Sequence, residues 1–175
     1  MATDVLGAVY QFCDQYLDPA PNIVRGWQNR AALPASSSLV ILTLLDTIRH
    51  GTNARSWNMT PPAGIKTTVS MLTEYVVQVD ICGLDEEIVN QQAALLMMLG
   101  RDPLAVEFFN AFNLQPLYAD DVKPLPFANE LDQWVTRYAV TLHLAGWTSL
   151  TVDQDAFSNV NVTIENVDVH HPPQE

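Results

Sequence analysis

Several residue types that mark common classes of protein are scarce in this chain. Only two residues are cysteines, and neither stands in a CxxC pair, so we expect Cys13 and Cys82 to be small buried side chains rather than nucleophiles or metal ligands. The longest apolar runs, LVILTLL and AALLMMLG, are far shorter than the roughly 20 residues of a membrane-spanning helix. No basic segment followed by an apolar one opens the chain, which argues against a secretory signal. We therefore expect a soluble protein that is made in a cytoplasm.

Basic side chains are also scarce, and the charge is unevenly distributed. The net charge is −12, with five basic and four acidic side chains in residues 1–66, but three basic and sixteen acidic ones in residues 67–175. Proteins that grip nucleic-acid phosphates need clustered lysine and arginine, so this balance argues against that function. An acidic surface could instead repel nucleic acid that slides past it, or it could serve solubility alone.

Sequence motifs for common chemistries are absent. The chain has no GxGxxG or GxxxxGK[ST] phosphate loop, no GxSxG nucleophile elbow and no HExxH pair. The sequence therefore predicts no enzyme, no catalytic residue, no metal and no cofactor. The competing interpretation is a small hydrolase that uses Asp120, Asp121 or His143. A pair of carboxylates with strongly shifted pKa values in a deep pocket would favour it.

Three segments have the spacing or the caps of helices. TDVLGAVYQFCDQYL has apolar residues near helical spacing, with Thr3 or Asp4 able to cap it. LDEEIVNQQAALLMMLG can be capped by Asp85, and its first-turn acids face the positive end of the helix dipole. RDPLAVEFFNAF can begin at Asp102, with a proline in its first turn.

Other segments have the patterns of strands. Residues 39–45 are β-branched and leucine-rich, which indicates a buried strand. TEYVVQVDICG alternates with period two, which predicts one buried and one mostly polar face. Residues 114–127 are extended and punctuated by proline, residues 131–147 alternate again, and residues 159–169 supply a last strand.

The order of these elements predicts an α+β fold with a mostly antiparallel or mixed β-sheet flanked by helices. At this length, folding removes roughly 70% of the extended-chain surface from water, so we expect residues 1–175 to form a single domain. Residues 50–66 hold two glycines and a Pro-Pro pair without periodicity, and we expect a long exposed loop or the tip of a hairpin there. Residues 170–175 should be a loose tail.

Residue types that are common at protein interfaces occur in the segments that have neither helical nor strand periodicity. Trp27, Arg30, Arg49 and Trp57 lie in or beside them, and tryptophan and arginine are the residues most often found at interface hot spots. The alternative is that Trp27 and Trp57 fold back as lids over the core. The remaining two tryptophans fall in the predicted strand 131–147, where we expect them to be buried.

Four segments carry a resemblance to a known family: IVRGWQNRAALP, VILTLLDTIRHGTN, TEYVVQVDICG and DPLAVEFFNAFNLQPLYADDVKPLPFANELDQWVTRYAVTLHL. In order and spacing they resemble the neck or tail terminator proteins of long-tailed bacteriophages, from about residue 5 to about residue 170. The most specific pieces are QNR followed by a proline and a strand, RHGTN closing that strand, and PLYADD leading into LPF. None of them is a reaction motif.

The resemblance implies a structural protein of the virion. Such proteins assemble in the host cytoplasm as a ring, typically a homohexamer, on the head-proximal end of the tail tube. They stop tube polymerisation and form the neck interface for head-tail joining, so the implied partners are further copies of the chain, the tail tube protein and the head-to-tail connector or adaptor protein. In contractile tails the ring also meets the tail sheath. DNA passes through the lumen without specific binding, and no membrane is involved.

A ring needs a heterologous interface, in which one face of each copy meets a different face of the next. We assign GWQNRAALP and residues 50–66 to such faces, and we expect contacts of complementary charge between the two differently charged parts of neighbouring copies. The candidate interface residues are Trp27, Gln28, Asn29, Arg30, Arg49, Arg55, Trp57, Asp120 and Asp121. The competing structural interpretations are a head-completion adaptor, a tube protein that polymerises into long stacks, and a binding module from a prophage region with no part in tails.

Overall fold

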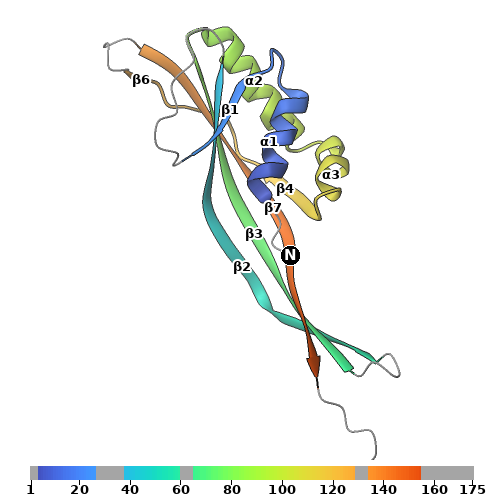
Figure 1. Ribbon diagram of the computed structural model, residues 1–175. Helices are drawn as coiled ribbons and strands as arrows, with labels where there is room; N and C mark the ends of the chain where they lie inside the picture. Colours follow the sequence, from blue (N-terminus) through green and yellow to red (C-terminus); the bar gives the residue numbers. More distant parts are fainter. Residues whose placement is uncertain (1–3, 27–37, 60–64, 129–133, 155–175) are drawn as a thin grey trace, which may run out of the picture.

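The computed structural model describes residues 4–26, 38–59, 65–128 and 134–154. In chain order the elements are α1 (Val5–Tyr16), β1 (Asn22–Arg25), β2 (Leu39–Met59), β3 (Ile65–Gly83), α2 (Glu86–Leu99), α3 (Pro103–Asn110), β4 (Leu114–Ala119), β5 (Lys123–Pro124), β6 (Phe127–Ala128) and β7 (Trp134–Gln154). Figure 1 shows the helices together on one side of a long, twisted sheet.

The sheet is mixed, and β3 lies at its centre. Its order is β1-β2-β3-β7-β4, with β5 and β6 also paired to β7. Among the strands that the structure describes, β1 with β2 is the only parallel pair, and the other pairs are antiparallel. The predicted α+β fold, with a mostly antiparallel or mixed sheet flanked by helices, is confirmed.

Each helix begins where an aspartate can hold its first free N–H groups. Asp4 accepts a hydrogen bond from the Gly7 N–H at 2.9 Å, Asp85 accepts from two N–H groups of α2, and Asp102 accepts from the Leu104 N–H at 2.9 Å. A side-chain oxygen at this position replaces a bond that the helix itself cannot make. The three predicted caps are therefore confirmed, and their acids are explained by local structure.

The main core lies between the helices and one face of the sheet, which we call the helix side. Val77, Val79 and Ile81 of β3 point to this side and are fully buried. Phe12 of α1 meets Phe109 of α3 at a ring-centroid distance of 4.9 Å. Burial of such aromatic side chains is the largest apolar contribution that single residues make to a core.

The opposite face of the sheet, which we call the open side, is polar but largely shielded from water near its centre. Asp80 and Cys82 of β3 are buried there, and Cys82 packs with Leu39 and Val135 in a second, small cluster. The predicted alternation in β3 is therefore correct in residue type, but its polar face is not simply solvated. Strands β2 and β7 pair with β3 on its two edges, so their side chains lie beside the polar side chains of β3 and reduce their contact with water.

Strands β2 and β3 are far longer than their sequence patterns predict, and β7 continues to Gln154, past its predicted end at Trp147. Beyond the helices they continue as a twisted three-stranded ribbon, here called the arm, made of residues 48–59, 65–73 and 147–154 (Figure 1). Residues 50–59 were expected in a long loop or hairpin tip. The loop prediction is wrong for them because they belong to β2, in which residues 50 and 54–59 pair with β3. Residues 60–64, between the two strands, lie outside the described residues.

The packing of the core predicts that two nearby aromatic residues of α1 contribute very differently to the free energy of unfolding. Phe12 is fully buried, whereas Tyr10 is 40% exposed. Phe12→Ala should lower the free energy of unfolding by about 3–5 kcal/mol because it leaves a cavity. Tyr10→Ala should change it by about 0.5 kcal/mol or less. Urea unfolding followed by circular dichroism measures both, and equal losses would contradict this placement of α1.

Candidate functional site

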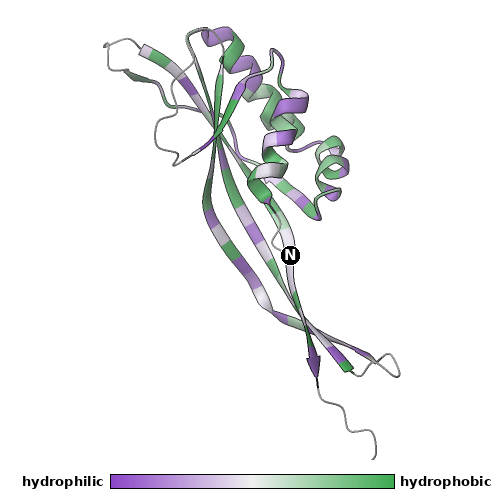
Figure 2. Ribbon diagram, viewed as in Figure 1, coloured by the Kyte–Doolittle hydropathy of each residue, from purple (hydrophilic) through white to green (hydrophobic). Residues whose placement is uncertain are grey.

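The two faces of the arm differ in composition. Residues opposite one another in an antiparallel register lie on the same face, so the pairing assigns each side chain to a face. One face, called here the apolar face of the arm, carries Arg55, Trp57, Ile65, Val69, Met71, Leu150 and Val152, together with Thr67, Thr148 and Gln154. The other carries Ser56, Asn58, Lys66, Thr68, Ser70, Ser149, Thr151 and Asp153, and nearer the body also Ile48, Ala54, Leu72 and Trp147. The outer part of the arm is therefore amphipathic by its register. Figure 2 shows bands of hydrophobic and hydrophilic residues along these strands.

The apolar face of the arm is exposed. Trp57 is 64% exposed, Leu150 66% and Val152 45%. The unbroken register from β3 to β7 places this face on the helix side, so the same side that the helices bury in the body continues without cover in the arm. An antiparallel sheet normally packs its apolar face on a core and leaves the polar face in water. Contiguous apolar patches of this kind mark sites of interaction.

Two arginines accompany this apolar face. Arg55 lies within it, and Arg49, opposite Thr73 in the register, lies on the same side nearer the body. The Arg49 Nε donates to the Gly51 carbonyl at 3.1 Å. Among the described residues neither guanidinium is paired with a carboxylate. A guanidinium beside exposed tryptophan and leucine is a combination typical of interface hot spots.

The tryptophans that the structure describes are not where the sequence predicts them. Trp134 and Trp147, expected to be buried, are 75% and 58% exposed. Trp147 lies immediately beyond Gly146, where β4 stops pairing with β7, and it stands opposite Leu72 of β3. Trp57 lies in strand β2 and is too exposed to be a lid over the core of this chain.

On the open side a carboxylate joins three strands. Glu74 of β3 accepts hydrogen bonds from His50 Nε2 of β2 at 2.5 Å and from His143 Nδ1 of β7 at 2.7 Å. Tyr118 of β4 stacks on the His143 ring with a centroid distance of 4.1 Å. The hydrogen bond from His143, and then the one from His50, hold the pKa of Glu74 below its ordinary value. No local sequence pattern assigns this glutamate a role, because its two histidine partners are 24 and 69 residues away in the chain.

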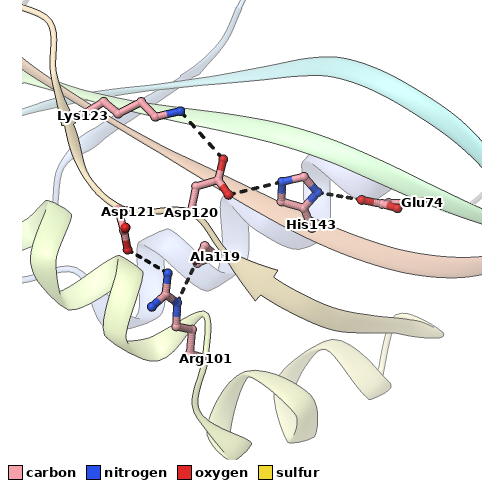
Figure 3. Close-up of polar contacts among 7 residues, drawn as sticks. All are labelled: Glu74, Arg101, Ala119, Asp120, Asp121, Lys123 and His143. Atoms are coloured by element: carbon pink, nitrogen blue, oxygen red, sulfur yellow. Dashed lines mark hydrogen bonds and ion pairs between the residues drawn. The ribbon is translucent and has the colours of Figure 1, made fainter.

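The adjacent acids Asp120 and Asp121 serve different cations (Figure 3). Asp120 lies 3.8 Å from His143 Nε2 and 4.0 Å from Lys123 Nζ. Asp121 pairs with Arg101 at 2.9 Å, and the Arg101 Nε donates to the Ala119 carbonyl at 2.9 Å. These contacts connect the residues that follow β4 to Arg101, which precedes α3, and to His143 of β7.

The polar groups of the open side do not form the carboxylate pair expected of a hydrolase. A general acid that works near neutral pH needs a raised pKa, whereas the pKa of Glu74 is lowered. Asp80 lies 2.9 Å from the Arg137 guanidinium, and Gln78 donates to both of its oxygens. Each of these contacts links neighbouring strands or positions of the sheet, which is the arrangement of a structural network.

Several predictions fall outside the described residues. These are Trp27, Gln28, Asn29 and Arg30, the strand expected at 159–169, and the tail at 170–175. Within the described part of the chain, no group of three or more histidine, cysteine or acidic residues is placed to hold a metal ion. None of the described helices combines the length and the apolar character that a membrane crossing requires.

The fold and surface thus define an α+β protein whose sheet extends into an exposed amphipathic arm. A family described as phage neck terminator protein matches residues 3–169, and this chain belongs to that family. Among solved structures, the chain is similar to the sheath/tube terminator, in its extended state, of an extracellular contractile injection system termed PVC, with a TM-score of 0.45 and 16% sequence identity. The match covers 98% of this chain and 65% of that chain. No curated protein matches the sequence significantly.

The Glu74 network predicts a defined dependence of stability on pH. Because the folded pKa of Glu74 lies below its ordinary value of 4.5, its ionisation stabilises the fold above that value, and this contribution is lost as pH falls through the folded pKa. Glu74→Gln should therefore cost about 1–3 kcal/mol at pH 7, and progressively less below pH 4.5. Urea unfolding between pH 3 and pH 7 measures this difference.

The matched control for this experiment is Glu107→Gln. Glu107 is an exposed acid on α3, so its replacement measures the general effect of removing one negative charge. Its effect on stability should be small across the whole pH range. A Glu74→Gln difference that is constant with pH, or that grows as pH falls, would contradict the assigned role of the carboxylate.

Proposed function

We propose that this chain caps the head-proximal end of a phage tail tube as a ring of six copies and stops tube polymerisation there. Membership of the phage neck terminator family is the observation that carries this proposal. The exposed apolar face of the arm supports it, because a protein that works by assembly needs surface that the monomer leaves uncovered. The ring would lie in the neck of the virion.

Capping needs two different ring surfaces. One would match the end of the tube, and the other would receive the head-to-tail connector or adaptor protein; in a contractile tail the rim would also meet the sheath. A closed ring joins its copies through a heterologous contact, so each copy must present two distinct lateral faces. Bond-making chemistry has no part in this function, and the paired acids of the open side act in holding the sheet together.

The charge of the chain supports passage of DNA through the ring without specific binding. A net charge of −12 disfavours adhesion to phosphates, and the acids that face the lumen would repel the passing duplex. Of the candidate interface residues, Arg49, Arg55 and Trp57 lie on the arm and are exposed, which favours them. Asp120 and Asp121 already have partners within the chain. Trp27, Gln28, Asn29 and Arg30 stay candidates.

Tube assembly tests the proposed function directly. Purified chain should form six-fold rings by negative-stain imaging, and should bind at one end only of tubes grown from the matching tube protein. Adding it during growth should shorten the tubes in proportion to its concentration, because each bound ring ends elongation. Tube length distributions measure the effect.

The control in this assay is heat-unfolded chain, which should leave tube length unchanged. Long stacks formed by the chain alone would identify a tube protein instead. Rings that bind filled heads but ignore tube ends would identify a head-completion adaptor. Either result would overturn the proposed function.

A further inference from the structure

We propose that the arm of one copy binds the helix layer of the next copy, with the apolar face of the arm against the outer surface of α1 and α3. This inference rests on the ring of the proposed function and names the contact that would close it. It commits to one occupant of the apolar face, a second copy of this chain.

The arm supplies an apolar, positively charged surface. Trp57, Leu150 and Val152 are exposed there, and Arg49 and Arg55 lie on the same side. The register places no aspartate or glutamate on this side of the arm within the described residues. A partner of the arm should therefore offer apolar side chains together with carboxylates.

The helix layer supplies that combination. The three helices contain no lysine or arginine, and their exposed acids are Asp14, Glu86, Glu87 and Glu107. Large apolar side chains also face outward from them, namely Tyr10, Met98, Leu104 and Val106. On α3, Leu104 and Glu107 are three residues apart and so share one face of the helix. The arm and the helix layer are thus complementary in charge and both partly apolar.

The two surfaces cannot meet within one copy. The arm leads away from the helices along the direction of the strands, and Figure 1 shows that its end lies far from all three of them. The contact must therefore join different copies, and because it pairs two unlike surfaces it is heterologous, which is the type that a closed ring requires. An isologous contact between two apolar faces would instead bury Arg49 and Arg55 of both copies without a carboxylate.

Charge reversal on each surface tests this contact. The arm variant carries Arg49→Glu and Arg55→Glu, and the helix variant carries Asp14→Lys and Glu107→Lys. Each variant alone places like charges in the contact, so the concentration needed for ring formation should rise about tenfold or more. An equimolar mixture should recover rings, because the acidic arm of one variant meets the basic helices of the other. Native mass spectrometry of variants of different mass measures the mixed rings.

The helix substitutions are chosen so that the helices still form. Asp14 lies in the last turn of α1 and Glu107 in the second half of α3, where a lysine suits the helix dipole. Glu86 and Glu87 are left unchanged because they face the positive end of α2. Lys66→Glu reverses a charge on the opposite face of the same arm, and it should leave ring formation unchanged. Mixed rings would also show that both variants fold.

A photocrosslinking residue in place of Trp57 gives a second readout. Crosslinks to residues 5–16 or 103–110 of another copy are the expected result. Crosslinks between two arms, or to residues 155–175, would overturn the inference, as would a mixture that stays disassembled. If the unmodified chain forms rings that cap tubes while these results fail, the inference alone is wrong. If the unmodified chain stays monomeric in the presence of tubes, the proposed function fails with it.

Discussion

The structure depends on a mismatch in length between the central strand and the helices that cover it. A strand rises about 3.3 Å per residue and a helix about 1.5 Å, so the nineteen residues of β3 extend about 63 Å, whereas the fourteen residues of α2 extend about 21 Å. The helices can therefore bury only part of one face of the sheet. The rest of that face becomes the arm, whose apolar side chains keep the pattern of a core strand but lack its cover.

The open side of the sheet is held by a different interaction. Where apolar packing is thin, polar side chains connect neighbouring strands: Glu74 accepts hydrogen bonds from two histidines, and Asp80 pairs with Arg137. A buried charge is costly unless it is paired, so a slip in the register of β2 or β7 would leave these carboxylates without their partners. We infer that the network fixes the register at the base of the arm, and so fixes which side chains the arm presents on each face.

Features of the fold that depend on a few consecutive residues could be predicted from the sequence. Features that depend on contacts between residues far apart in the chain could not. The caps Asp4, Asp85 and Asp102 follow from a rule that involves only the next few residues, and each is confirmed. The length of β2 depends on pairing with β3, and its period-two pattern is interrupted by irregularities between Leu44 and Asp46 and between His50 and Ala54. The Glu74 contacts also join positions far apart in the chain, so no local pattern predicts them.

The wrong burial predictions bear on function. Residue type and strand position predict that Trp134 and Trp147 are buried, and within one copy they are not. The residue types of a sequence suit the state in which the protein functions. In a protein that assembles, side chains that are exposed in one copy can be buried against another copy. An uncovered apolar ribbon in a permanent monomer would risk indiscriminate edge pairing and aggregation. Lys66, Arg49 and Arg55 on the arm oppose such pairing, because like charges repel one another. The same positive charges would favour a partner surface that is acidic, and so would make the contact selective.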